Sequence, residues 1–195
     1  MKRLINIFVA LLLFATILSA QNEWKFDKSH SKVGFSVTHL VITDVEGQFK
    51  DFDGKIIAKG DSFEDAEIEF EAKVASIDTD NEDRDKHLKA DDFFNAEKYP
   101  KLTFKSKSFK KVDDSEYKLI GDLTIKDVTK EVELNVEYRG TVKDPWGNTK
   151  AGFELEGEIN RFDYNLKWSK TLETGGLVVS DKVEIFAKLE LQKVK

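Results

Sequence analysis

The stretch RDKHLKADD (84–92) holds a dense group of side chains that could do chemistry. It places one imidazole, one guanidinium and three carboxylates within nine positions. Imidazole and carboxylate groups bind zinc and related ions, and as a pair they can act as general base and general acid. The stretch therefore raises three hypotheses: an active site, a metal site, or a charged structural element.

A short helix is predicted over about residues 82–90. Asn81 and the aspartate before it are suitable N-cap residues, two acidic residues follow in the first turn, and no proline interrupts the stretch. On such a helix Asp83, His87 and Asp91 are spaced by four residues and share one face. This geometry permits a metal site or an acid–base pair.

The number of available ligands favours a structural role for this stretch. A closed metal site needs three or four ligands, yet the chain has no cysteine and only two further histidines, His30 and His39. Motifs of zinc proteases, serine hydrolases and nucleotide-binding loops are absent. We therefore assign no catalytic residue and no metal ligand, and interpret the stretch as a capped helix followed by an aromatic anchor, FFNAEKYP (93–100). The alternative is an exported enzyme, with or without a metal, that uses His30, His39 and His87 with nearby acids.

The first twenty residues predict a secretory signal peptide. Two basic residues precede an apolar run from Leu4 to Leu18, and a small residue, Ala20, follows it closely. The run has 15 residues, whereas a bilayer span needs about 20, so stable membrane insertion is not expected. Cleavage near Ala20 would leave one mature domain, residues 21–195, in the periplasm or secreted from the cell.

The mature domain is acidic and contains no cysteine. Removing the two basic leader residues leaves 29 of the 31 basic side chains against 37 acidic ones, a net charge of −8. Nucleic acids and anionic membrane surfaces are bound mainly through clustered Lys and Arg, so neither is an expected partner. Stability must come from a packed core rather than from disulfides, and a domain of this size can supply such a core.

Apolar and polar residues alternate along most of the domain, which predicts strands with one face in solvent. The pattern is present at residues 33–39, 49–58, 67–74, 102–105, 118–126, 131–138, 153–159 and 183–191. Turn residues separate these stretches at Asp53-Gly54, Gly60-Asp61, Asp113-Asp114, residues 144–148 and Gly175-Gly176. Apart from the short helix predicted at 82–90, no helical run lies between the strands, so the prediction is an all-β, antiparallel barrel or sandwich of about eight strands.

Four separated stretches are similar to one known family. They are FDKSHSKVGFSVTHLVITDVEGQF (26–49), SIDTDNEDRDKHLKADDFFNAEKYPKLTFKSKSF (76–109), GDLTIKDVTKEVEL (121–134) and EINRFDYNL (158–166). In this order they resemble the YceI-like family of exported bacterial proteins, with departures at Asp127 and Tyr164-Asn165 that affect only turns. The resemblance implies an extended, eight-stranded, lipocalin-like antiparallel barrel with one long apolar tunnel for a polyisoprenoid or similar long-chain lipid, and it suggests a homodimer.

The predicted inward-facing rows mix large aromatic side chains with small ones. Alone, this pattern fits either a filled interior, in a barrel that only mediates interactions, or an interior with space for a ligand. The resemblance favours the tunnel, and with it a non-enzymatic carrier whose only bound group is its lipid. The residues predicted to line the tunnel are Phe35, Val37, His39, Phe70, Ala72, Phe104, Leu119, Gly121, Leu134, Phe153, Phe162 and Trp168. For a lipid that ends in phosphate, the groups available to meet it are His39, Arg84, Arg161 and Lys167.

Overall fold

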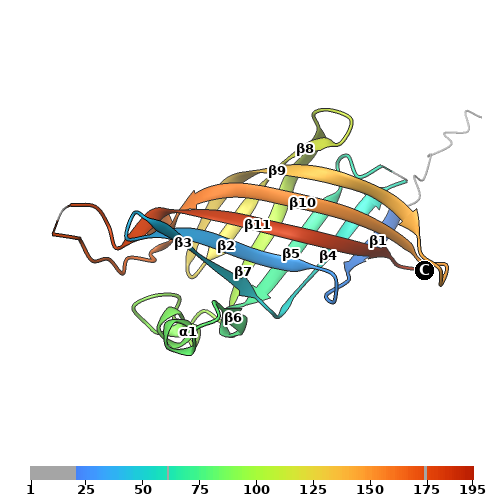
Figure 1. Ribbon diagram of the computed structural model, residues 1–195. Coiled ribbons are helices and arrows are strands. Elements are labelled where there is room, and N and C mark those ends of the chain that lie inside the picture. The colour runs from blue at the N-terminus through green and yellow to red at the C-terminus, as the bar shows by residue number, and fades with distance from the viewer. Residues whose placement is uncertain (1–20, 61, 174) are drawn as a thin grey trace, which may run out of the picture.

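The computed structural model describes residues 21–60, 62–173 and 175–195, which are built mainly from β-strands (Figure 1). The predicted signal peptide lies outside the described residues. The strands are β1 (Gln21–Phe26), β2 (Lys32–His39), β3 (Thr43–Phe49), β4 (Phe52–Lys59), β5 (Glu67–Lys73), β6 (Ile77–Asp78), β7 (Lys101–Lys111), β8 (Glu116–Ile125), β9 (Val128–Lys143), β10 (Thr149–Asn160) and β11 (Val179–Lys193). The helices described are α1 (Glu82–Lys89) and two 3₁₀ helices, η1 (Val74–Ser76) and η2 (Arg161–Tyr164).

Eight of the described strands close into an antiparallel barrel. Their hydrogen-bonded order is β1-β4-β5-β7-β8-β9-β10-β11, and β1 pairs with β11 to complete the ring. Strand β11 serves two neighbours, since residues 191–193 pair with β1 whereas residues 179–188 pair with β2. Strands β3 and β6 extend the sheet beyond β2. The structure confirms the predicted eight-stranded barrel, which is elongated along β11 (Figure 1).

The alternating pattern identified the long barrel strands but missed three others. In β8, every second residue from Tyr117 to Ile125 is buried, as the sequence pattern predicts for a strand with one inward face. The strands without a prediction are β1, β3 and β6. Strand β6 has only two residues, and β3 reads TDVEGQF, which is too polar to show the pattern.

The turn predicted at Asp53-Gly54 is wrong, because both residues lie inside β4. A side chain at Gly54 would collide with the carbonyl oxygen of Glu69 and with the ring of Phe26. The glycine is therefore required by the close approach of a neighbouring strand and an aromatic ring rather than by a turn. The chain reverses instead at residues 50–51, between β3 and β4.

The predicted helix is confirmed, and Asn81 is its N-cap. The Asn81 side chain accepts a hydrogen bond from the backbone N–H of Arg84 at 2.9 Å. The expected stack of Asp83, His87 and Asp91 does not form, because α1 ends at Lys89 and Asp91 lies beyond it. Instead His87 Nε2 lies 3.0 Å from a carboxylate oxygen of Asp92.

The aromatic anchor after α1 consists of Phe93 and Phe94, both buried. The Phe94 ring packs edge-on against Phe49, with 6.4 Å between ring centroids. This contact attaches the segment between β6 and β7, residues 79–100, to β3. Tyr99 and Pro100 contribute less than predicted, since Tyr99 is only half-buried and Pro100 is exposed.

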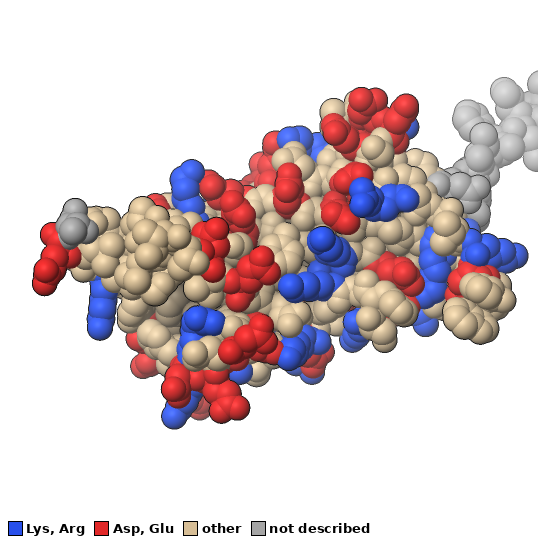
Figure 2. All heavy atoms as spheres, in the orientation of Figure 1, with Lys and Arg blue, Asp and Glu red and all other residues tan. Residues whose placement is uncertain are grey.

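The outer surface carries both signs of charge, intermixed over the face shown in Figure 2. Cross-strand pairs such as Lys101–Glu71 and Lys118–Glu133, at 2.7 Å each, account for many of these contacts. Exposed pairs of this kind add little stability individually, and they keep the outer face of the barrel hydrated. Among the described residues, none of the helices has the length and apolar character that crossing a bilayer requires.

Candidate functional site

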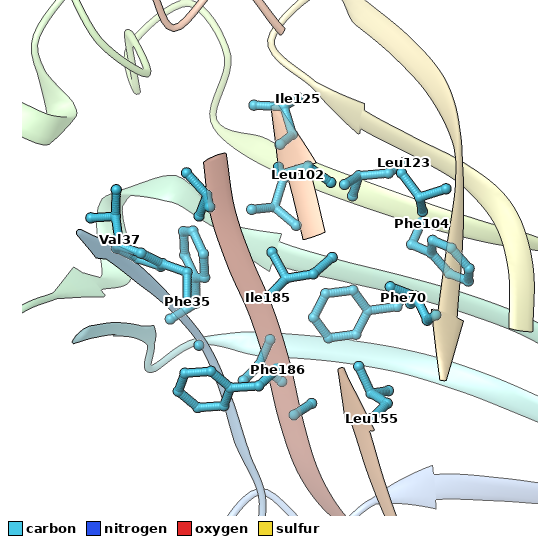
Figure 3. A pocket seen from close by; sticks show the side chains of 18 of the residues that line it. Phe35, Val37, Phe70, Leu102, Phe104, Leu123, Ile125, Leu155, Ile185 and Phe186 are labelled. Carbon is cyan, nitrogen blue, oxygen red and sulfur yellow. The ribbon is translucent and has the colours of Figure 1, made fainter. Parts of the chain in front are cut away.

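The barrel encloses a cavity of about 390 Å³, which lies within the size range of small-molecule binding sites. Inward-facing aliphatic and aromatic side chains form its wall, and Figure 3 shows Phe35, Phe70, Phe104 and Ile185 directed into the same space. Along β11 the wall runs from Val179 to Leu191. Twelve residue steps correspond to roughly 40 Å of strand, or about 30 Å along the axis of a barrel whose strands are tilted by about 40°.

Most residues predicted to line a tunnel do lie on this wall. Those found there are Phe35, Val37, His39, Phe70, Phe104, Leu119, Leu134, Phe153 and Trp168. Their position is a fact of the structure, whereas their contact with a ligand remains a prediction.

Three predicted lining residues lie elsewhere. Ala72 is completely buried in β5 and is not among the residues that line the cavity. Gly121 does face inward, but a side chain there would overlap the ring of Phe104, which covers it. Phe162 lies against the guanidinium of Arg161, whose Cζ is 4.3 Å from the ring centroid, and is absent from the wall.

Packed aromatic rings lie at one end of the cavity. Phe63 lies 4.8 Å from Phe153 and 5.7 Å from Tyr138, measured between ring centroids, and Trp24 lies 5.0 Å from Phe63. Such offset and edge-to-face contacts stabilise aromatic clusters. The alternative of a filled interior therefore describes this end, the aromatic end, but not the length of barrel beyond it.

The opposite end of the cavity, the polar end, carries the wall's hydrogen-bonding side chains. They are His39, Thr79, Arg84, His87, Arg161 and Trp168. The rings of His87 and Trp168 meet edge-on with centroids 5.4 Å apart, so α1 and the chain after η2 are in contact here. The sequence did not predict Thr79, Leu88, Phe93 or Phe94 as wall residues. They lie in the segment 79–100 between β6 and β7, which has no alternation of apolar and polar residues to show which side chains face inward.

Arg161 is the most deeply buried charged side chain of the polar end, with 2% of its surface exposed. Its guanidinium donates hydrogen bonds to the backbone carbonyls of Leu166, Trp168 and Ser180 at 2.7 Å each, and to that of Val179 at 3.0 Å. Burial lowers the pKa of Arg161 below its ordinary value. The side chain therefore ties the segment after η2 to the start of β11 and fixes the rim of the cavity.

Arg84 reaches the wall from α1 and is half-buried. Its Nε donates to Thr79 Oγ1 at 2.7 Å and its Nη2 donates to the Thr79 backbone carbonyl at 2.6 Å. Asp85 binds the other side of the same threonine, accepting hydrogen bonds from its N–H and its hydroxyl at one carboxylate oxygen. Thr79 thus holds the guanidinium in place at the cavity and bridges it to Asp85.

Comparison with known proteins shows which family this chain belongs to. The model of the YceI-like domain matches residues 24–191. The chain belongs to the YceI family. The protein YceI of Shigella flexneri is 39% identical over 168 residues, which cover 85% of this chain and 87% of that protein.

Solved YceI-family structures share the barrel. The YceI protein of Campylobacter jejuni is 35% identical, with a TM-score of 0.69 over 87% of this chain and 96% of that one. A polyisoprenoid binding domain from Saccharophagus degradans matches with a TM-score of 0.63 over 88% of this chain and 98% of that one. Its sequence identity is 16%, so this second likeness concerns the fold.

The three histidines of this YceI-family protein do not form one site. His39 and His87 lie on the cavity wall, whereas His30 lies outside it, in the loop between β1 and β2. The structure therefore gives no support to an enzyme site built from all three histidines.

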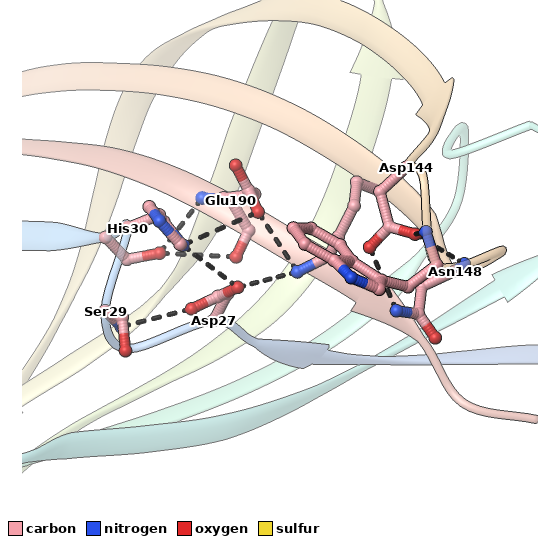
Figure 4. Close-up of polar contacts among 9 residues, drawn as sticks. Asp27, Ser29, His30, Asp144, Asn148 and Glu190 are labelled. Carbon is pink, nitrogen blue, oxygen red and sulfur yellow. Dashed lines mark hydrogen bonds and ion pairs between the residues drawn. The ribbon is translucent and has the colours of Figure 1, made fainter.

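A second polar cluster surrounds His30, where β1, β10 and β11 meet (Figure 4). One ligand atom from each of Asp27, His30 and Glu190 lies within 4.8 Å of the others, a spacing that a metal ion could use. The ammonium of Lys150, however, lies 2.6 Å from Asp27 Oδ2 and 3.1 Å from Glu190 Oε1. The ammonium of Lys150 accounts for the convergence of the two carboxylates. The cluster of Asp27, His30, Lys150 and Glu190, the seam cluster, joins β10 and β11 to the end of β1, where the pairing of β1 with β11 closes the barrel.

Asp27→Asn is expected to lower the free energy of unfolding at pH 7 by about 2 kcal/mol. The hydrogen bond from Lys150 lowers the pKa of Asp27 from 3.8 to about 2. Because the folded-state pKa lies below the unfolded one, this stabilisation is present above about pH 4 and is lost as the pH falls through about 2. Urea unfolding between pH 7 and pH 2 should therefore show a weaker acid dependence in the variant.

The matched control is Asp53→Asn, which removes an exposed pair with Lys28 whose side chains are 61% and 46% accessible. It should change the free energy of unfolding by less than about 1 kcal/mol. Equal losses of unfolding free energy in Asp27→Asn and Asp53→Asn would show that the seam cluster stabilises the fold no more than an exposed ion pair does.

Proposed function

We propose that the protein is a non-enzymatic carrier that encloses one long-chain polyisoprenoid, or a lipid of similar amphiphilic form, inside its barrel. The observation that supports this most is the wall of the cavity, which is apolar over most of its length and polar at one end. A linear amphiphile matches this distribution, since its chain would contact the apolar wall and its head group the polar end. The common fold with a polyisoprenoid binding domain is consistent with this ligand class.

Burial of the chain supplies the binding free energy. Each methylene moved from water into an apolar environment contributes roughly 0.8 kcal/mol, so a chain of about fifteen carbons offers on the order of 10 kcal/mol before ordering costs. Binding of this kind needs no reactive side chain. The closed barrel also keeps the chain out of water, which a carrier must do and an open sheet would not.

Export and assembly belong to the same proposal. Removal of residues 1–20 near Ala20 would place the domain in the periplasm or outside the cell, where lipids must cross water. A homodimer is the assembly that the family resemblance suggests. Mass measurement of the host-purified protein, expected to begin at Gln21, and its molar mass in solution test both statements.

Lipid identification tests the carrier itself. Protein purified from its own host without detergent should carry about one chain-like lipid per barrel, visible by native mass spectrometry and identifiable after solvent extraction. The host matters because another cell would offer a different set of lipids. A barrel that is empty when purified in this way, and that takes up no added polyprenol, would contradict the proposal.

A further inference from the structure

The ionisable groups on the cavity wall are of one kind, which distinguishes the wall from the outer surface. Outside, lysines pair with carboxylates of neighbouring strands. On the wall, the described residues contribute no Asp, Glu or Lys, and the ionisable side chains there are His39, Arg84, His87 and Arg161. The polar end therefore concentrates groups that carry or can acquire positive charge.

Arg84 has hydrogen-bonding capacity that the protein does not use. A guanidinium has five N–H donors, and the bonds to Thr79 occupy one at Nε and one at Nη2. Nη1 has no partner among the described residues, and no described carboxylate forms an ion pair with this guanidinium. The contrast is Arg139 on the outer surface, which lies 2.6 Å from Glu137 and 3.6 Å from Glu154.

Arg161 adds a second positive charge at the same end. Its Nη1 donates to the Trp168 carbonyl, and the Trp168 ring contacts His87, one helical turn from Arg84. Backbone carbonyls take four of its hydrogen bonds, so its position is fixed by the fold. It contributes charge to the polar end rather than a mobile donor.

Two guanidinium groups beside an apolar cavity, neither of them ion-paired to a carboxylate of the described residues, form a preorganised site for an anion. Guanidinium binds phosphate and carboxylate through paired, charge-assisted hydrogen bonds, which gain strength where water is largely excluded. We propose that Arg84, held by Thr79 and supported by Arg161, binds the anionic head group of the enclosed lipid. The cavity then prefers chains that end in phosphate or carboxylate over the same chains ending in a hydroxyl group. This inference rests on the proposed carrier function and adds the class of head group to it.

Three probes with one chain length separate the head group from the chain. Delipidated protein at pH 8 is titrated with hexadecyl phosphate, hexadecanoate and hexadecanol, each below its aggregation limit, and Kd is measured by displacement of a fluorescent lipid. The two anions should bind at least about tenfold more tightly than the alcohol, the range expected for hydrogen bonds to a charged group. The comparison between the anions shows which oxyanion the site prefers.

Arg84→Gln is the decisive variant. It should bring the affinities for both anions to within about threefold of the alcohol while leaving the alcohol unchanged, whereas Arg84→Lys should retain part of the preference. Arg139→Gln, at an exposed and paired arginine, should behave as the wild type. Equal wild-type affinity for all three probes would overturn the head-group site and leave the carrier intact, and a preference that survives in Arg84→Gln would also overturn it. Uptake of no probe at all would overturn the carrier proposal, and the head-group site with it.

Discussion

Arg161→Met should lower the free energy of unfolding by about 3–5 kcal/mol, a large share of the roughly 5–15 kcal/mol that typical domains possess. The guanidinium donates hydrogen bonds to four backbone carbonyls, and its removal takes this donor away from each of them. Each buried polar group left without a partner costs about 1–3 kcal/mol, and the four costs overlap because the rim can relax. Methionine keeps most of the volume, so the loss reports the hydrogen bonds rather than a void.

Urea unfolding of three variants isolates this effect. Arg161→Lys keeps the charge but not the planar arrangement of donors, so it should recover less than half of the loss. Arg139→Met removes an exposed arginine whose side chain is 54% accessible, and should change the free energy of unfolding by less than about 1 kcal/mol. Similar losses in Arg161→Met and Arg139→Met would show that the carbonyl contacts do not hold the rim.

The fold was predictable because the alternation of apolar and polar residues along a strand indicates which face of the strand is exposed to solvent. The strand β8, with its regular burial of every second residue, and the N-cap at Asn81 follow from local sequence alone. Alternation does not record how deep an inward side chain lies. Alternation directs both Ala72 and Gly121 inward, yet neither lines the cavity, and at Gly121 the Phe104 ring takes up the space. Their exclusion from the wall depends on neighbours that are distant in sequence.

The polar end was less predictable than the barrel, again for a physical reason. In the sequence, Arg84 stands among acidic residues of the predicted helix and is one of four candidates for contact with an anionic head group. In the structure its hydrogen-bond partner is Thr79, and the side chain lies on the wall of a cavity formed mainly by the strands of the barrel. Arg161 likewise sits in a short 3₁₀ helix, and its contacts with residues of β11 arise only when the barrel closes. Residue types identified the candidates, and only the tertiary structure selected their partners.

Ala187→Phe should weaken binding of a long-chain lipid by roughly a hundredfold while leaving the barrel folded. Ala187 lies on the wall in the middle of β11, between Ile185 and Leu189, so a ring at this position enters the cavity. Excluding three or four methylenes from contact would cost about 3 kcal/mol, which corresponds to that change in Kd. The position suits this test better than Ala72 or Gly121, where a larger side chain would overpack the wall instead of filling the cavity.

The control lies one residue further along the same strand. Lys188 is exposed on the outer face of β11, so Lys188→Phe adds a ring of the same type to the outside and should leave Kd unchanged. Leu155 lies on the wall in the adjacent strand β10 and is the cross-strand partner of Ala187. Leu155→Trp should therefore narrow the same part of the cavity and reproduce the effect of Ala187→Phe. Thermal unfolding checks that each variant retains the barrel. If folded Ala187→Phe and Leu155→Trp both bound lipid as tightly as Lys188→Phe, the chain would have to lie outside this cavity, because a ring inside it cannot share the space with a bound chain.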